Sequence, residues 1–292
     1  GGFLEYLKGM RFKGRLWIKP EGTIVKAGEP VVRIRAAKLQ LMIMRTVLNN
    51  TLGFNSLIAT KASRIVHAAQ GRGVSEYGLR RAQGEAGWQA SRAAFIAGAI
   101  ATSNVYAGKL FGVPLSGTMA HSLVMSLLKQ LDAFRAFARV YRDKKPVLLI
   151  DTYDTLHGAQ DAVIVADELR EQGRQLFAVR IDSGDLARLS QEVRRIFDEA
   201  GYDGKKYHKI LIFVSSDLDE YKIADLVEQE APIDGFGVGT RMVTGGEQSI
   251  LSGDFSESNR DDDQFIEVDL AGLNPQTPRE LFQVREYALQ QM

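Results

Sequence analysis

The feature that most constrains the fold of this chain is a regular alternation of short apolar runs and amphipathic stretches in its second half. The apolar runs are Val147–Ile150, Leu176–Ile181, Ile210–Val214 and Gly235–Val238. Segments with helical periodicity lie between them, over Ala159–Gln172, Ala187–Ala200 and Glu220–Gln229. Short, continuous apolar runs are typical of buried parallel strands, and their alternation with helices predicts a parallel sheet covered by helices.

The same pattern extends upstream with two weaker candidates. Val74–Tyr77 and Val113–Ser116 are predicted as strands, and an Ala-rich stretch predicts one helix over Gly87–Leu110. Six strands are fewer than the eight of a complete barrel. The predicted fold class is therefore α/β, as an irregular, incomplete (β/α) barrel, with an open sheet as the alternative.

Both ends of the chain depart from this alternation. Residues 12–36 contain short alternating runs separated by Gly/Pro turns, and a helical pattern follows up to Gln70. We therefore predict three parts. Residues 1–72 form a β-strand module with a linking helix, 73–246 form the α/β barrel that carries the active site, and 247–292 form an acidic loop (Asp261–Asp263) and a C-terminal helix.

Composition excludes several classes of protein. The chain has no cysteine, which rules out disulfides, thiolate metal sites and cysteine nucleophiles. Its 37 Lys+Arg and 36 Asp+Glu nearly balance, so nothing favours nucleic-acid or membrane binding. No apolar run approaches the roughly 20 residues of a membrane span. We predict a soluble, cytoplasmic protein with neither a nucleic acid nor a membrane as partner.

Small, polar or charged residues follow every predicted strand. These clusters are 76–81, 116–122, 151–154, 180–185, 215–217 and 237–240. The carboxyl ends of parallel strands are where α/β proteins place their sites. Clusters after all six strands therefore predict an active site at this edge of the sheet.

Two of the clusters suggest a phosphate site. Gly237, Gly239 and Thr240 end the last predicted strand, and glycines allow the backbone and its N–H groups to approach a phosphate. Ser216 follows the preceding strand, and barrels often bind phosphate with their last two loops. The alternative for the glycines alone is an ordinary strand-to-helix turn.

The acidic clusters have several possible uses. Asp185 is placed to cap the helix that follows it, whereas Asp182 projects from the strand end and favours a ligand, either a divalent cation or a sugar diol. Asp151 and Asp154 carry oxygen ligands of the kind that hold Mg²⁺ together with substrate phosphates. These residues predict an enzyme that handles a phosphorylated, ribose-bearing ligand with Mg²⁺, but they do not fix the reaction.

Two other features have open interpretations. Arg80 and Arg81 follow Tyr77, so a guanidinium could clamp a carboxylate or phosphate while the aromatic ring stacks on a flat ligand. A salt-bridged pair at a helix start is the alternative. His121 lies between a predicted strand and an apolar helix, where a capping or core histidine is as good an explanation as a catalytic one.

Taken together, these motifs resemble the nicotinate phosphoribosyltransferase family. The matching stretches, in family order, include NSLIATKASRIVHAA (55–69), EYGLRRAQG (76–84), GVPLSGTMAHS (112–122), LLIDTYDTLHGA (148–159), VRIDSGDL (179–186) and DGFGVGTRMVT (234–244). The resemblance implies a barrel of the type II phosphoribosyltransferase kind. It also implies that nicotinate and phosphoribosyl pyrophosphate are joined to give nicotinate mononucleotide and pyrophosphate, with ATP hydrolysis coupled to the step.

The resemblance also implies roles for individual residues. His121 resembles the histidine that ATP phosphorylates, Asp182 the acceptor of the ribose hydroxyls, and Arg180 a catalytic cation near the phosphates. Asp151 resembles a residue close to the Mg²⁺–pyrophosphate. The implied substrate-binding residues are Tyr77, Arg80, Ser103, Thr118, Ser216, Gly237, Gly239 and Thr240.

Substrate specificity can be argued locally. Related nicotinamide-using enzymes carry an acidic residue near the position of Thr102-Ser103-Asn104, whereas here no charge would repel a carboxylate. This favours nicotinate over nicotinamide, with quinolinate as a further alternative. The resemblance implies a homodimer as well. After Gly245-Gly246 the family pattern is interrupted, so a catalytically inactive ligand-binding protein on the same scaffold is the alternative from another class.

Overall fold

The four apolar runs form neighbouring parallel strands in the computed structural model, which describes residues 1–142, 144–247, 251, 266–267 and 278–292. The predicted acidic loop at 261–263 lies outside the described residues. The sheet has six strands in the order β4-β3-β8-β7-β6-β5. Its strands are β3 (Gly73–Glu76), β4 (Ala101–Thr102), β5 (Val147–Leu149), β6 (Ala178–Ile181), β7 (Leu211–Val214) and β8 (Gly235–Val238).

All the strand pairs of this sheet are parallel. From β5 to β8 each strand pairs with the next one in the chain, as expected when a helix crosses over between them. β8 then pairs with β3, with Gly235 opposite Gly73. The two edge strands, β4 and β5, are not paired with each other, so the curled sheet is a half-barrel. This confirms the predicted α/β class and the incomplete barrel.

The crossover helices begin where an aspartate caps them. These helices are α7 (Thr155–Glu171), α8 (Leu186–Glu199) and α9 (Glu220–Glu228). The side chains of Asp154, Asp185 and Asp219 each accept a hydrogen bond from a backbone N–H of the first turn. Capping by Asp185 is thus confirmed, and Asp154, considered above as a possible metal contact, has the same capping role.

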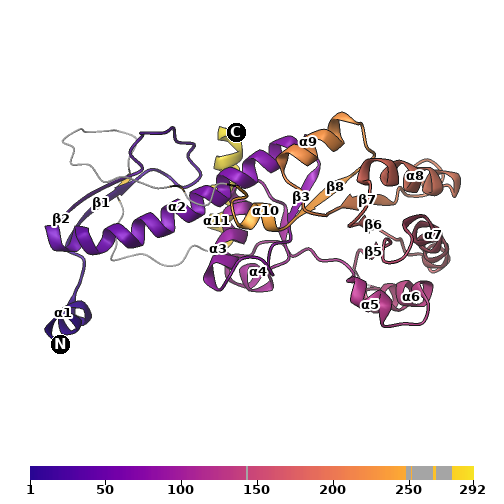
Figure 1. Ribbon diagram of the computed structural model, residues 1–292, viewed down its shortest axis with the longest axis horizontal. Helices are drawn as coiled ribbons and strands as arrows, with labels where there is room; N and C mark the ends of the chain where they lie inside the picture. The colour runs from indigo at the N-terminus through magenta and orange to yellow at the C-terminus, as the bar shows by residue number, and fades with distance from the viewer. Residues whose placement is uncertain (143, 248–250, 252–265, 268–277) are drawn as a thin grey trace.

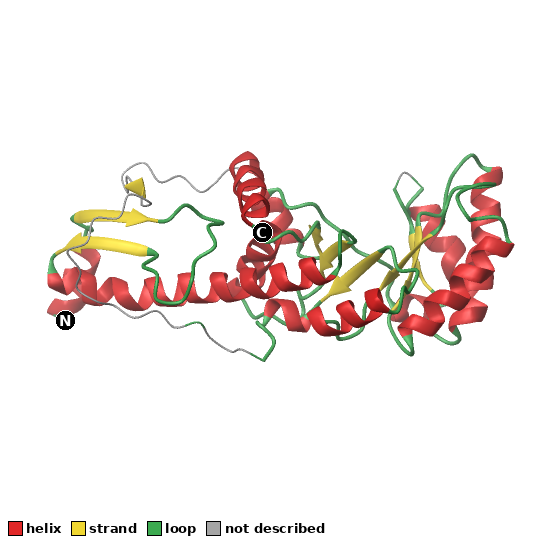
Figure 2. Cartoon of the chain, turned by 90° about the horizontal axis from the view of Figure 1, so that it is seen from above, coloured by secondary structure: helices red, strands yellow, loops and turns green. Residues whose placement is uncertain are grey.

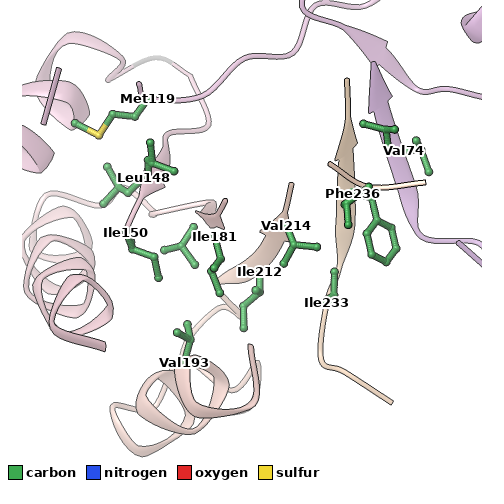
Figure 3. Close-up of a cluster of buried hydrophobic side chains, with 14 of the residues drawn as sticks. Val74, Met119, Leu148, Ile150, Ile181, Val193, Ile212, Val214, Ile233 and Phe236 are labelled. Atoms are coloured by element: carbon green, nitrogen blue, oxygen red, sulfur yellow. The ribbon is translucent and has the colours of Figure 1, made fainter. Parts of the chain in front are cut away.

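The core lies between the sheet and these helices. Figure 3 shows side chains from the strands, among them Leu148, Ile181 and Val214, gathered with Val193 of α8. Each of these four side chains is fully buried. Every residue of β5 and of β8 is buried, so both faces of these strands are covered, as expected in a parallel sheet.

Two predicted elements are wrong. The helix predicted over Gly87–Leu110 is instead α3 (Glu85–Ile96), the short strand β4 and α4 (Val105–Phe111). Gly98, with φ +109°, breaks the helix in a conformation that L residues rarely adopt.

The second wrong element is the strand predicted over Val113–Ser116. It reduces to a single bridge between Leu115 and Thr102. Pro114 has no N–H to extend a ladder, and only its carbonyl and the N–H of Ser116 bond to Thr102.

The predicted β-rich module is present at the N-terminal end. β1 (Gly14–Ile18) pairs antiparallel with β2 (Val32–Ala36) and with β9 (Ile266–Glu267). The helix α2 (Lys38–Ala68) then runs from this module to the barrel as one 31-residue element (Figure 1). The structure adds α1 (Gly2–Gly9), which the sequence pattern did not predict.

The remaining helices lie at the two ends of the sheet. α5 (His121–Met125) and α6 (Gln130–Val140) lie beside β5 and α7, whereas α10 (Thr240–Val243) and α11 (Pro278–Gln291) pack against α3, near the other edge (Figure 1). A second buried cluster joins Leu281 and Ala288 of α11 to Phe95 and Phe111, so the C-terminal helix packs against α3 and α4 (Figures 1 and 2). Among the described residues, no helix is both long and apolar enough to span a bilayer.

Candidate active site

The strand ends bring the predicted residues to one edge of the half-barrel. Asp151 follows β5, Asp182 follows β6 and Ser215 follows β7, while Glu76 and Thr102 end β3 and β4. Because the strands are parallel, all of these residues lie at the same edge of the sheet. The residues after Pro114 join them without a strand, through the loop that leads to His121.

Asp151 is held in place by the neighbouring strand end. Its Oδ2 accepts hydrogen bonds from the backbone N–H of Asp182, at 2.9 Å, and from the hydroxyl of Ser183, at 2.5 Å. The other oxygen, Oδ1, is buried and has no hydrogen-bond partner. One oxygen therefore orients the carboxylate, and the second is left for a ligand.

Asp182 lies at the centre of the predicted catalytic residues. Its Oδ2 is 3.6 Å from a guanidinium nitrogen of Arg180 and 3.6 Å from Nε2 of His121. Its Oδ1 accepts a hydrogen bond from the hydroxyl of Ser215. Arg180 also donates to the hydroxyl of Thr118, at 2.5 Å. The structure thus brings together the three predicted catalytic residues and one predicted substrate-binding residue.

His121 makes a second contact that the sequence did not indicate. Its Nδ1 lies 3.1 Å from the hydroxyl of Thr152, in the loop after β5. Because Nδ1 faces a hydroxyl and Nε2 faces Asp182, the imidazole ring has one defined orientation. The ring is partly exposed, which leaves it open to a bound molecule.

Tyr77 and Gly237 are in contact across neighbouring strands. A Cβ atom at Gly237 would come within 2.5 Å of two ring atoms of Tyr77, so only glycine leaves room for the ring in this position. The hydroxyl of Tyr77 lies 3.2 Å from that of Ser116. At Gly239, a Cβ atom would lie 3.3 Å from the carbonyl oxygen of Tyr77. Both glycines therefore accommodate Tyr77, in addition to any approach to phosphate.

The loop after β7 has an unusual backbone. Ser216 and Asp217 are exposed and have positive φ values of 116° and 44°. Non-glycine residues adopt such values at a cost, and they concentrate at functional sites. Thr240, predicted to bind the same phosphate, begins α10 directly after Gly239.

Arg80 and Ser103 lie on the other side of the site. Arg80 is exposed in a turn after β3, in which the N–H of Arg81 donates to the carbonyl of Gly78. The N–H of Ser103 donates to the carbonyl of Glu76, at 2.8 Å, and its hydroxyl is buried without a hydrogen-bond partner. That hydroxyl is free to bond a ligand.

Sequence reasoning did not select Glu76, Thr152 or Ser215 as site residues. All three lie in the polar clusters that follow the predicted strands (76–81, 151–154 and 215–217), so position alone could have indicated them. The contact of Thr152 with His121, a residue 31 positions away, has no signal in the sequence.

The residues fit a magnesium ion only in part. No group of three or more His, Asp or Glu side chains in the described part of the chain could hold a metal by itself. Mg²⁺ is commonly held by one or two carboxylates together with substrate phosphates. The unpartnered Oδ1 of Asp151 fits that arrangement.

Two surface hollows, of about 790 and 930 Å³, lie away from these residues. The first is lined by residues at the amino ends of β3 and β8, among them Arg72 and Asp234. The second lies between α2 and α9, at His67 and Tyr221. Neither includes a predicted site residue, and the geometry at the carboxyl ends of the strands is the better guide to the active site.

The half-barrel and the polar edge of its sheet define an α/β fold of the type II phosphoribosyltransferase kind. The model of the nicotinate phosphoribosyltransferase (NAPRTase) family matches residues 72–252, and the chain belongs to this family. A nicotinate phosphoribosyltransferase of Mycobacterium tuberculosis is 43% identical over 242 residues, which cover 82% of this chain and 50% of that protein. The chain thus spans about half the length of the curated relatives it matches.

Solved structures give the same result. The crystal structure of human nicotinic acid phosphoribosyltransferase superposes with a TM-score of 0.73 at 28% identity, covering 81% of this chain and 58% of that one. The nicotinate-nucleotide pyrophosphorylase of Pyrococcus furiosus superposes with a TM-score of 0.77 at 26% identity, covering 96% and 80%.

Proposed function

We propose that this protein joins nicotinate to phosphoribosyl pyrophosphate, giving nicotinate mononucleotide and pyrophosphate in NAD salvage. The observation that carries the proposal is the convergence of His121, Arg180 and Asp182 beside Asp151, inside the segment that matches the family. In the reaction, the pyridine nitrogen forms a bond to the anomeric carbon of the ribose as the bond to pyrophosphate breaks. No protein nucleophile is needed for this step.

Catalysis would then come from orientation and charge. The anomeric carbon gains oxocarbenium character as pyrophosphate leaves, so cations near the leaving group lower the barrier. Arg180 supplies such a charge, and Asp182 accepts from the ribose hydroxyls. Asp151 would hold Mg²⁺ through its free oxygen, and the ion would neutralise charge on the pyrophosphate. Tyr77 and Arg80 would bind the pyridine ring and its carboxylate.

The phosphate end of the substrate would lie at the last two strands. Ser216, Gly237, Gly239 and Thr240 are proposed to bind the 5′-phosphate, with Thr118 and Ser103 completing the substrate contacts. Support comes from the strained backbone at Ser216 and from the unpartnered hydroxyl of Ser103. The latter also supports nicotinate as substrate, since a hydroxyl does not repel a carboxylate as an acid would.

We also propose that ATP hydrolysis is coupled to the transfer through His121. In the tautomer in which Nδ1–H donates to the hydroxyl of Thr152, Nε2 keeps its lone pair and can attack the γ-phosphorus of ATP, releasing ADP. Water then releases phosphate from the phosphohistidine. The contact of Nδ1 with Thr152 supports this role, because it orients the ring while Nε2 lies 3.6 Å from Asp182, beyond hydrogen-bond distance. A cytoplasmic homodimer belongs to the same proposal. The exposed side chains of Tyr106 and Leu128 support the dimer, because a partner subunit could cover them.

The test is pyrophosphate release from phosphoribosyl pyrophosphate and Mg²⁺ with nicotinate, nicotinamide or quinolinate, each with and without ATP. Release with nicotinate that is faster with ATP is the expected result. If pyrophosphate is released only with nicotinamide or only with quinolinate, that pyridine, and not nicotinate, is the substrate. The protein should also be tested together with any segments that its relatives have in addition. If it then folds and binds these ligands without turnover, it is an inactive ligand-binding protein.

A further inference from the structure

Glu76, at the end of β3, is a buried carboxylate that the proposed reaction does not use. Its side chain is 1% exposed, and none of the ion pairs in the described part of the chain involves it. A charge removed from water without a cation is costly unless several hydrogen bonds compensate for it. The hydrogen-bond donors around this carboxylate must therefore compensate for its burial.

Three donors surround the carboxylate. The backbone N–H of Gly78 donates to Oε1, and the hydroxyls of Ser91 and Thr102 donate to Oε2, at 2.8 and 2.5 Å. A carboxylate only accepts hydrogen bonds, so it matches all three donors at once. An apolar residue would leave them unpaired, and an amide would direct its own N–H groups at some of them.

Two of the three donors, Gly78 and Thr102, belong to segments that border the active site. Gly78 follows Tyr77 in the loop that carries Arg80, and Thr102 precedes Ser103. The carbonyl of Glu76 also accepts from the N–H of Ser103, at 2.8 Å. On the far side, the hydroxyl of Thr102 accepts from the N–H of Asn104, at 2.9 Å. The side chain of Glu76 thus fixes the loop that carries Tyr77, and its side chain and carbonyl together fix the loop that carries Ser103.

We propose that Glu76 is a positioning residue that holds the Tyr77 loop and the Ser103 loop in register, and so sets the affinity for the pyridine substrate without touching it. This rests on the proposed function, since Tyr77 and Ser103 bind that substrate only if the protein is a nicotinate phosphoribosyltransferase. Ser91 ties the same carboxylate to α3, so the two loops are fixed against the body of the barrel.

The test is Glu76→Gln, which keeps the size of the side chain and replaces one acceptor oxygen by an NH₂ group that cannot accept. The KM for nicotinate should rise about tenfold, as for loss of a hydrogen bond to a charged group, while the KM for phosphoribosyl pyrophosphate changes by less than about twofold. Amide hydrogen exchange at Gly78, Ser103 and Asn104 should become faster, with exchange in β6 and β7 unchanged.

Asp161→Asn is the matched control. Asp161 is also a buried carboxylate, 7% exposed, but it accepts from Gln130 on the outer helices, away from the site. Its substitution should leave both KM values unchanged. If Glu76→Gln does not fold, Thr102→Val removes one of the donors and should raise the KM for nicotinate, whereas Thr102→Ser keeps the hydroxyl and should restore it.

The outcomes separate the two proposals. Unchanged KM for nicotinate, or faster exchange throughout the sheet with the KM values unchanged, would mean that Glu76 only stabilises the fold. If the parent protein releases no pyrophosphate with any pyridine, the proposed function fails. In that case the exchange measurement alone decides whether Glu76 fixes the two loops, and unchanged exchange in them would overturn the inference.

Discussion

Asp182 is the side chain on which the predicted catalytic residues converge, since both His121 and Arg180 lie 3.6 Å from its Oδ2. Asp182→Asn removes the charge but keeps the size of the side chain. We expect binding of phosphoribosyl pyrophosphate to weaken by about 1–3 kcal/mol, measured by calorimetry. Asp185→Asn is the control, because asparagine caps a helix as well as aspartate does. Unchanged affinity in Asp182→Asn would exclude the ribose diol as its ligand.

The role of His121 can be separated from ribosyl transfer itself. We expect His121→Ala to abolish stimulation by ATP and to keep part of the ATP-independent pyrophosphate release, because the histidine is assigned only to phosphorylation. The ratio of rates with and without ATP is the measurement. A ratio equal to that of the parent protein would show that the phosphohistidine assignment is wrong.

Gly237 has a packing role that the sequence did not indicate, in addition to its proposed contact with phosphate. A methyl group here would lie 2.5 Å from the ring of Tyr77, so Gly237→Ala must displace the ring. We expect the free energy of unfolding to fall by about 1–3 kcal/mol, as in other overpacked sites, and the KM for nicotinate to rise. Gly9→Ala, where a Cβ atom meets nothing within 4 Å, should change neither. A normal KM would mean that the Tyr77 ring does not bind the substrate.

At this scale the sequence predicts which residues lie near the site but not how they touch. Asp151 and Asp182 could be placed at one edge because each follows an apolar strand. Thr152 could not be assigned to His121, nor Ser215 to Asp182, because these contacts join residues 31 and 33 positions apart. Such pairs depend on the curvature of the sheet, which no local pattern encodes.

Whole elements are predicted best where periodicity and a cap agree. α7, α8 and α9 each have an amphipathic face and an aspartate at the N-cap, and the structure has all three. The stretch from residue 87 to 110 has the composition of a helix but no capping residue at its predicted start. There Gly98 breaks the helix, and Asn104 starts a new one by accepting from the N–H of Ala107.

One element-level prediction concerns the end of α8. Burial, and then the hydrogen bond to Asp167, raise the pKa of the Tyr202 phenol from 10.0 to about 12. The folded state thus holds this proton more tightly than the unfolded chain does, and its contribution to stability is complete below pH 10 and is lost as the pH rises towards 12. Urea denaturation at several pH values should show this loss in the parent protein but not in Tyr202→Phe. An identical alkaline decline in both proteins would contradict it.

At the scale of the whole molecule, segments distant in the sequence meet on the barrel side of α2. The turn between β1 and β2 reaches α3, where Glu21 forms a two-point ion pair with Arg92. The hydroxyl of Thr23 lies 3.4 Å from that of Tyr287 in α11. The sequence pattern divides the chain into three parts, yet these contacts join the first part to both the middle part and the last.

Leu281 tests whether α11 belongs to the cooperative unit of the barrel. It is fully buried with Phe95 and Phe111, so Leu281→Ala should cost about 2–5 kcal/mol of unfolding free energy. Trp88, which packs on Phe111, reports on the same region by fluorescence. We expect fluorescence and circular dichroism to shift together in urea, and Leu289→Ala, 37% exposed on the same helix, to shift both by less than about 1 kcal/mol. If fluorescence instead changes at lower urea concentration while the main circular dichroism transition stays unchanged, residues 247–292 unfold as an independent unit, as the sequence pattern suggests.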